Sequence, residues 1–488
     1  MIKKKTDTQQ ERMSRMKKTQ FNGMPVRILI CVICILVCHS LSLSLYAQTS
    51  KHGKIVVHPE KRFLQYEDGT PFFYLGDTAW ELFHRQNLDD ARTYLTDRAM
   101  KGFNVIQAVI LSEFDGLLTP NVNGDLPFID DKFTIPNEAY FRHVDAIIQI
   151  MDSLGIVAGV LPTWGDKIVK SGIGPVIFDS EKKSEDYGRY VGNRYKDYKN
   201  IIWILGGDRD YTDYKHIIRA MAKGIAIGVA GKEDYDKCLM TVHTYGGKSS
   251  SEWFHNDNWL DFNMQQNGHC YDVPVWERIQ RDYNMSPIKP VIDGEPLYDE
   301  HPVCFNRNEH GTSTDYQVRR FFYQNVFSGA FGHTYGCHAI WQMWTPDRKP
   351  LNGPVRPWTE SLGLIASYQM GYGRSLIESR PFFTRIPDQN LIVEGQQEGT
   401  RRITATRDRK GSYAMIYSEQ GDPFAINTQL LSGEKLVAWW FDVRSGRSHK
   451  IGVFDKTDSQ WFYPPTKGKG NDWVLVLDDI SQKFAEPG

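Results

Sequence analysis

From about residue 72 to residue 372, short apolar runs rich in β-branched residues alternate with amphipathic stretches of helical period. The runs of strand length are residues 72–75, 105–111, 156–161, 201–205, 239–242, 260–264, 290–292 and 338–341. The helical stretches between them are residues 89–101, 140–154, 186–198, 214–229, 275–283, 315–327 and 360–370. Near-continuous apolar strands that alternate with helices predict a parallel sheet covered on its outer face.

Eight such strands favour a closed (β/α)₈ TIM barrel, which we place at residues 48–372. The alternative is a doubly wound open sheet. It usually has fewer strands, and no G-x-G-x-x-G turn follows the first strand here. A short strand pair, residues 54–58 and 63–66, precedes the barrel and is expected to cap its bottom.

Beyond residue 372 the pattern changes to strand-like stretches separated by Gly, Asp and Pro clusters, with no helical period. These stretches are residues 412–417, 424–430, 435–442, 449–454 and 472–477. They predict a small antiparallel β-sandwich at residues 373–488, packed against the barrel. We expect Trp439 and Trp440 to belong to its core rather than to a ligand platform.

Residues 1–47 have the pattern of a secretory signal peptide. A basic stretch precedes an apolar run at residues 28–38, and Ala47 is a small residue at the expected cleavage position. The alternative is an uncleaved membrane anchor, but His39 and several serines interrupt the apolar length that a spanning helix needs. The protein is therefore expected to be exported, either to the periplasm or to the cell surface and medium, with no membrane span in the mature chain.

The net charge argues against a nucleic-acid partner. It is −1 for the whole chain, but without the basic residues 1–47 the remaining 50 basic and 57 acidic residues give −7. Phosphate binding needs a concentrated basic face instead. The composition, 41% hydrophobic and 24% charged, is that of a globular protein.

Four of the seven cysteines lie beyond residue 47, namely Cys238, Cys270, Cys304 and Cys337. They lack C-x-x-C spacing, so we predict no zinc site. They could pair in three ways, but a chain of this length does not need cross-links, and most are expected to be buried thiols. We predict no metal and no cofactor.

Carboxylates and aromatic residues follow the ends of the predicted strands, where a barrel gathers its chemistry. No G-x-S-x-G, H-E-x-x-H or Cys/His nucleophile pattern is present in the sequence. Sugars offer apolar faces to aromatic rings and hydroxyls to carboxylates. Cleavage of a glycosidic bond needs two carboxyl groups, one to protonate the leaving oxygen and one to oppose the positive charge that develops on the sugar.

Asp208 and Glu295 are the predicted catalytic pair, because each directly follows an apolar strand and strands four and seven face each other across an eight-strand ring. The preceding glycines, Gly206, Gly207 and Gly294, are expected to leave room for substrate. A carboxyl separation of ~5–5.5 Å would predict retention of configuration and ~6.5–9.5 Å inversion, and the sequence leaves this open.

Seven further residues near strand ends are predicted to contact substrate. They are Asp77, Trp80, Trp164, His243, Tyr245, Gln265 and Trp341. His243 and Tyr245 alternate along strand five, so both side chains should point into the barrel mouth, where His243 could orient a catalytic carboxylate.

Four motifs resemble glycoside hydrolase family 140, the apiosidases: YLGDTAW at residues 74–80, GFNVI at 102–106, IWILGGD at 202–208 and DGEP at 293–296. The resemblance extends over residues ~52 to 480 and includes the tail, which is similar to a β domain of collagen-binding type. It implies a (β/α)₈ barrel that removes terminal apiose from rhamnogalacturonan II, a pectic polysaccharide of plant cell walls. It also implies Asp208 as the acid/base and Glu295 as the nucleophile of a retaining enzyme.

Two other hypotheses stay open. One keeps the mechanism and changes the sugar, as in an arabinofuranosidase or a β-glycosidase. The other is a surface protein that binds carbohydrate or matrix on an inactive barrel, and the presence of both Asp208 and Glu295 counts against it.

Overall fold

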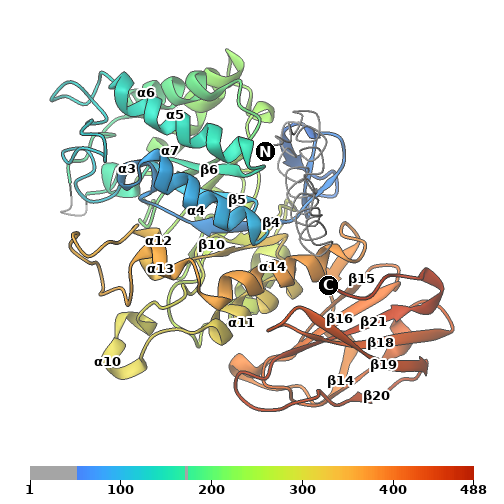
Figure 1. The fold of residues 1–488 in the computed structure, drawn as a ribbon. Helices are drawn as coiled ribbons and strands as arrows, with labels where there is room; N and C mark the ends of the chain where they lie inside the picture. Colours follow the sequence, from blue (N-terminus) through green and yellow to red (C-terminus); the bar gives the residue numbers. More distant parts are fainter. Residues whose placement is uncertain (1–51, 171–173) are drawn as a thin grey trace, which may run out of the picture. The chain divides into compact units, whose positions relative to one another are not determined.

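Eight parallel strands form the core of the first domain in the computed structural model, which describes residues 52–170 and 174–488 (Figure 1). In ring order they are β4 (Tyr74–Thr78), β5 (Val105–Leu111), β6 (Val157–Thr163), β7 (Ile201–Gly206), β8 (Met240–His243), β10 (Asn263–Gln266), β11 (Val291–Asp293) and β12 (Gly332–Tyr335). Parallel pairing runs from β12 through β4 to β8 and joins β10 to β11. The Asp261 N–H donates to the Met240 carbonyl and the Phe331 N–H to the Val291 carbonyl, which links the two groups into a ring. The (β/α)₈ prediction is confirmed.

Helices follow the strands along the chain and cover the outside of the ring. The long ones are α4 (Leu88–Met100), α5 (Glu138–Ser153), α6 (Glu181–Tyr195), α7 (Lys215–Ala230), α9 (Val275–Tyr283), α11 (Asp315–Phe327) and α14 (Ile365–Glu378). Single-turn helices are α3 (Leu82–Arg85), α8 (Ser251–Phe254), α10 (Arg307–His310), α12 (His338–Trp341) and α13 (Trp358–Ser361).

The prediction that residues 338–341 form the eighth strand is wrong. That run forms α12, and the strand is β12, just upstream. An apolar run of four residues fits a strand and a buried helical turn equally well, so periodicity could not separate them. The true strand carries His333 and Thr334, whose polarity hid it although both are fully buried.

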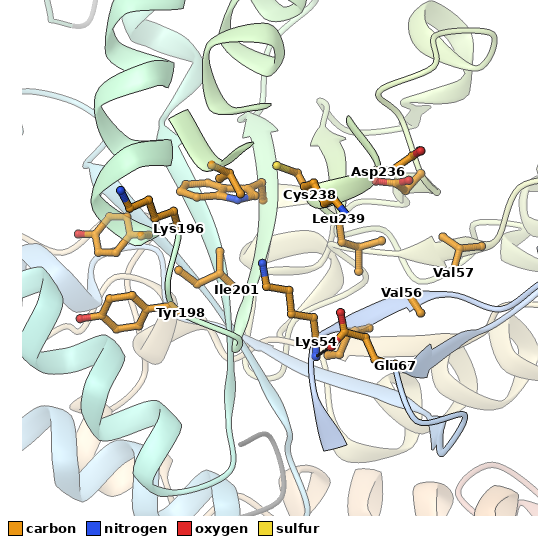
Figure 2. Close-up of a pocket in the computed structure, with 16 residues that line it drawn as sticks. Lys54, Val56, Val57, Glu67, Lys196, Tyr198, Ile201, Asp236, Cys238 and Leu239 are labelled. Carbon is orange, nitrogen blue, oxygen red and sulfur yellow. Dashed lines mark hydrogen bonds between the residues drawn. The ribbon is translucent and has the colours of Figure 1, made fainter. Parts of the chain in front are cut away.

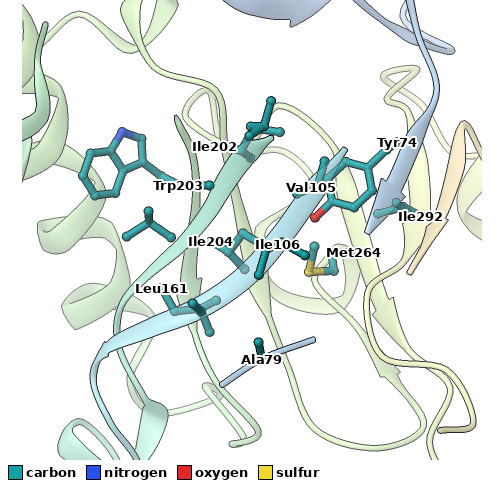
Figure 3. Packing of buried hydrophobic residues seen from close by; sticks show 14 of the residues in the cluster. Tyr74, Ala79, Val105, Ile106, Leu161, Ile202, Trp203, Ile204, Met264 and Ile292 are labelled. Carbon is teal, nitrogen blue, oxygen red and sulfur yellow. The ribbon is translucent and has the colours of Figure 1, made fainter. Parts of the chain in front are cut away.

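The interior of the ring is filled by apolar side chains from successive strands. Figure 3 shows Ile204, Met264 and Ile292 of β7, β10 and β11 among the residues of this cluster. A filled interior supports the strand ends rigidly, and this is what fixes the positions of the residues that follow them.

The predicted N-terminal strand pair is present and gains a third strand. β1 (Ile55–Val57), β2 (Leu64–Tyr66) and β3 (Pro71–Phe72) form an antiparallel sheet. Residues of β1 line a cavity together with Ile201 and Leu239 at the starts of β7 and β8, so this sheet lies at the bottom of the barrel as expected. The two-residue β9 (Lys248–Ser249) pairs with β10.

The C-terminal region is the predicted antiparallel two-sheet domain. The larger sheet contains, in order, β13 (Arg385–Pro387), β15 (Thr404–Asp408), β16 (Tyr413–Ser418), β21 (Trp473–Asp479), β18 (Lys435–Asp442) and β19 (Arg447–Asp455). The smaller sheet contains β14 (Ile392–Glu394), β17 (Phe424–Ile426) and β20 (Gln460–Phe462). The preceding helix α14 continues to Glu378, past the predicted boundary at residue 372.

The larger sheet is apolar on both faces. In β16, Ala414 and Ile416 belong to the core of the sandwich, whereas Met415 and Tyr417 belong to the cluster that fills the barrel domain. The Tyr417 ring stacks on Tyr323 of α11, with centroids 4.9 Å apart. Because side chains alternate along a strand, one sheet serves two cores.

Two buried arginines join the barrel helices to this sheet. Arg319 of α11 donates to both carboxylate oxygens of Asp472, at 2.8 and 3.0 Å. Arg380 makes the same two-pronged contact with Asp478 at 2.8 Å. The predicted packing of the tail against the barrel is confirmed.

The two tail tryptophans have different surroundings. Trp440 is in the sandwich core as predicted, while Trp439 is partly buried on the barrel-facing side. Two of the four cysteines beyond residue 47, Cys238 and Cys337, are the expected buried thiols. The other two form the disulfide Cys270–Cys304, which the sequence did not predict.

The predicted signal peptide, residues 1–47, lies outside the described residues. Within residues 52–170 and 174–488, none of the helices combines the length and the apolar character needed to cross a bilayer.

Candidate active site

A cavity of about 790 Å³ opens at the carboxyl ends of the barrel strands. Six of the nine predicted site residues line it, from five strand ends and α12: Trp80, Trp164, Asp208, Tyr245, Glu295 and Trp341. Its other side chains include Glu113, Arg209, Gln266, His269, Tyr298, His301 and Phe305. The described C-terminal domain contributes none of its lining residues, so the tail does not flank the entrance.

Glu295 lies two residues beyond β11, with its carboxylate almost fully buried at the base of this cavity. His269 Nε2 lies 3.1 Å from Oε1, and His243 Nε2 lies 3.0 Å from Oε2. Burial alone would raise the pKa of Glu295, but the two imidazoles outweigh it and hold the pKa at about 2. The carboxylate form of Glu295 is therefore favoured near neutral pH.

Asp208 has the opposite character. Burial in the cavity, followed by repulsion from the Glu295 charge, raises its pKa to about 6, while His243 and Arg209 act in the other direction. The exposed part of its side chain, 42%, faces this cavity, where protein walls replace much of the bulk water. Two carboxyl groups with pKa values moved apart in one pocket are the arrangement that separates an acid from a nucleophile.

The backbone at Asp208 is in the left-handed region, with φ of 42°, and it follows Gly206 and Gly207 at φ 78° and 141°. Aspartate tolerates this conformation better than most residues. The glycines do not make room for substrate, which corrects the prediction. A Cβ on Gly207 would lie 2.5 Å from the Trp164 ring, and one on Gly294 would lie 2.6 Å from Met264. The space is used by the protein's own side chains.

His243, the last residue of β8, connects the two carboxyl residues. Its Nδ1 accepts the backbone N–H of Asp208 at 3.4 Å, so the ring proton is on Nε2, which faces Glu295. The predicted orienting role for His243 therefore has a geometric basis, although the buried ring does not itself line the cavity.

Aromatic rings surround the pair. Trp80 and Trp164 have centroids 5.2 Å apart, and each lies within 5.6 Å of the His243 ring. Tyr245 lies at the rim, where its hydroxyl donates to Asp210 at 3.4 Å. Trp341 is almost fully buried on α12, and its Nε1 donates to His338. The structure therefore brings these four predicted residues together around one cavity.

Asp77 and Gln265 do not line this cavity, so the prediction of substrate contact is corrected for both. Asp77 is fully buried and accepts from Tyr94 at 2.8 Å and Arg98 at 2.5 Å, both on α4. Gln265 donates to Asp282 of α9 at 2.9 Å. Side chains alternate along a strand, and both residues point outward to the helices.

Several cavity residues escaped the sequence prediction. Gln266, one position along from Gln265, faces Asp208. Glu113 also lines the cavity, and burial together with the charge of Glu81 raises its pKa well above the usual value. His269 comes three residues after β10, beyond the positions read from the strand end. A wider reading of each loop would have included it.

Six polar atoms of residues that line the cavity have no aligned hydrogen-bond partner within the described part of the chain. They are Trp164 Nε1, Arg209 Nε, Gln266 Oε1, His269 Nδ1, Glu295 Oε2 and Tyr298 Oη. Buried polar atoms are normally paired, so a cluster of unpaired donors and acceptors at one cavity indicates a ligand with several hydroxyl groups.

A second cavity of about 490 Å³ lies at the opposite end of the barrel (Figure 2). Its lining includes Lys54, Lys196, Asp236, Cys238 and Asp261. It contains none of the predicted site residues.

Comparison with known proteins agrees with this geometry. Residues 58–384 match a family model described as "Apiosidase-like, catalytic domain", and residues 386–478 match a "Putative collagen-binding domain of a collagenase". A solved structure called "Glycoside hydrolase" is 34% identical, with a TM-score of 0.79 over 88% of this chain and 98% of that chain.

A glycoside hydrolase family 5 structure from Bacteroides vulgatus is 32% identical, with a TM-score of 0.81 over 89% of this chain and 95% of that chain. Among curated proteins, none matches the sequence. These similarities support an enzyme that hydrolyses glycosidic bonds.

Proposed function

Because this chain belongs to the apiosidase-like family of glycoside hydrolases, we propose that it removes apiosyl residues from rhamnogalacturonan II fragments with retention of configuration. The observation that carries the proposal is the pair Asp208 and Glu295, with pKa values of about 6 and 2 in one cavity.

In the first step, protonated Asp208 donates its proton to the leaving oxygen while Glu295 attacks the anomeric carbon. His269 lies 3.1 Å from Oε1 of Glu295 and His243 lies 3.0 Å from Oε2, so the two imidazoles hold the carboxylate in place for the attack. The products of this step are the free alcohol and a glycosyl ester of Glu295.

The second step follows from the first by electrostatics. Once Glu295 is an ester it carries no charge, and the repulsion that helped to raise the pKa of Asp208 disappears. With its pKa lowered in this way, Asp208 stays ionised and accepts a proton from the water that attacks the anomeric carbon. The bond between the sugar and Glu295 breaks, which releases the free sugar and restores the Glu295 carboxylate. One residue can therefore act as acid and then as base.

Export is part of the proposal. Its support is the signal-peptide pattern of residues 1–47 together with the disulfide Cys270–Cys304, a bond typical of oxidising compartments. The partner would be a plant cell-wall oligosaccharide or polysaccharide outside the cytoplasm.

The test is to incubate the protein with rhamnogalacturonan II fragments and identify the released monosaccharide. Proton NMR of the first product would show which anomer forms. Release of free apiose in the configuration of the substrate supports the proposal, and release of another sugar, or inversion, contradicts it. A panel of aryl arabinofuranosides and β-pyranosides covers the alternative specificities, and binding without sugar release would indicate a non-catalytic carbohydrate-binding protein.

A further inference from the structure

Two loops meet beside Glu295, and the disulfide Cys270–Cys304 joins them. The first follows β10 and carries His269 next to Cys270, while the second follows β11 and carries Glu295 and Cys304. The Cys304 N–H donates to the His269 carbonyl at 2.8 Å, and the Gly268 N–H donates to the Glu295 carbonyl at 3.2 Å. The covalent link therefore lies one residue from a side chain that contacts the proposed nucleophile.

His269 is held on several sides by residues of the second loop. Its ring stacks on His301 with centroids 4.0 Å apart, and it lies 4.6 Å from the Tyr298 ring and 5.4 Å from the Phe305 ring. If the two loops separated, the imidazole would lose these contacts and its 3.1 Å contact with Glu295 Oε1 together.

Phe305 is placed by the same link. Cys304 and Phe305 both have left-handed backbone angles, with φ of 50° and 60°, a conformation that two successive non-glycine residues rarely adopt without support. Phe305 lines the cavity although 63% of it is exposed, so an apolar ring stands at the rim. Such a ring offers a face to a sugar in the substrate.

We propose that the Cys270–Cys304 disulfide is a positioning element of the active site, which holds His269 against Glu295 and holds Phe305 at the cavity rim. This inference rests on the proposed function, because it assigns Glu295 the role of nucleophile. Neither cysteine touches substrate in this scheme. Asp272 lies near the two sulfurs, but both sulfurs are committed to the disulfide rather than to a metal.

The two parts of the proposal, the positioning of His269 and the positioning of Phe305, predict different kinetic effects. Loss of His269 from Glu295 removes one of the groups that lower the pKa of Glu295, so the acidic limb of the pH profile moves to higher pH and kcat falls. Loss of Phe305 from the rim weakens substrate binding and raises KM. A purely structural cross-link would change thermal stability without moving the acidic limb.

The experiment compares the full chain with its C270S/C304S double variant. We expect kcat/KM to fall about ten- to a hundredfold, the cost typical of a small displacement of a catalytic group, with the acidic limb shifted upward. H269A should reproduce the shift of the limb, and F305A should reproduce the rise in KM. Unchanged kcat, KM and acidic limb in the folded double variant would overturn the proposal.

Reduction of the wild-type protein covers the case in which the double variant does not fold. Tris(2-carboxyethyl)phosphine and one water convert the disulfide to two thiols and become the phosphine oxide, so the electrons and protons balance. Two additional titratable thiols with an unchanged circular dichroism spectrum define the reduced, folded enzyme. The same kinetic changes are then expected, and their absence contradicts the proposal.

C238S is the matched control, because Cys238 is a buried free thiol at the other end of the barrel. E295Q separates this inference from the proposed function. If E295Q is inactive while reduction has no effect, the positioning role alone fails. If E295Q remains active, the proposed function fails.

Discussion

The two ends of the barrel both carry a polar cavity with a perturbed carboxyl group, yet their surroundings differ. At the top, the charge of Glu295 acts on Asp208 inside a cavity lined by tryptophan and histidine side chains. At the bottom, Asp261 has a pKa raised to about 7 by burial, and its carboxylate accepts the Met240 N–H at 2.7 Å. The bottom group ties the start of β10 to β8, and the neighbouring charge of Asp236 only adds to the rise in its pKa.

The difference teaches that a shifted pKa is not by itself a sign of catalysis. Burial raises the pKa of any carboxyl group, whereas the opposite shifts at the top need a charged or hydrogen-bonding neighbour beside each group, Glu295 for Asp208 and two histidines for Glu295. Cys238 in the bottom cavity makes the same point, because burial raises the pKa of its thiol to about 12 and so leaves it unreactive. In a barrel of parallel strands, the loops that follow the strands converge at the carboxyl ends, which is the top, and this is where the catalytic side chains are gathered.

Among the variants that test this comparison, E295Q should have the largest effect on activity. Removal of the nucleophile should lower kcat about 10⁴-fold or more, since neither step can proceed without it. Sugar release from pectic fragments gives the rate, and calorimetric titration should still detect binding. Near-normal turnover would contradict the assignment of the top cavity as the active site.

The next largest effect is expected from D208N, with a loss of about 10²–10⁴-fold. In the wild type, protonated Asp208 is the active form, so kcat/KM should fall as the pH rises through about 6 and the acid loses its proton. D208N should lack this basic limb, and aryl glycosides with good leaving groups should suffer less in the first step. An unchanged limb would mean that another group is the acid.

H243A should have an intermediate effect. The ring touches Glu295 and accepts from the backbone of Asp208, and its loss should cost about 1.5–3 kcal/mol of transition-state stabilisation, the worth of a contact with a charged group. Because His243 helps to lower the pKa of Glu295, the acidic limb should also move to higher pH. If kcat falls but the acidic limb of the pH profile does not move, His243 has a packing role only.

D261N at the bottom should have the smallest effect on activity. Asparagine keeps an oxygen for the Met240 N–H, so kcat and KM should stay within error of the wild type. Thermal unfolding should report the change, with a difference in stability of about 1 kcal/mol. A large loss of kcat would show that the two ends are coupled and would weaken the comparison.

Much of the fold was readable from periodicity, because parallel strands buried on both faces form unbroken apolar runs. β12 was missed since His333 and Thr334 replace the expected apolar residues. Asp208 and Glu295 were placed correctly at strand ends, whereas Asp77 and Gln265 were each assigned to the wrong side of a strand. A sequence does not show where alternation begins, so a register error of one residue turns a side chain from the cavity to a helix.

The contacts that tune the site depend on loops. His269 approaches Glu295 where two loops meet, and these loops are joined by Cys270 and Cys304, which are 34 residues apart along the chain. No local pattern encodes that distance, and four cysteines allow three pairings.

The larger sheet of the tail, with apolar side chains on both faces, makes the accessory region inseparable from the enzyme. Expressed by itself, the tail would expose the apolar barrel-facing side of its larger sheet to water. A barrel truncated before the tail would leave Arg319 without its partner Asp472 and would expose the face of α11 that packs on this sheet. The tail is thus an integral part of the folded enzyme rather than an independent module. Loss of the tail should shorten the working lifetime of the enzyme before it alters the choice of substrate.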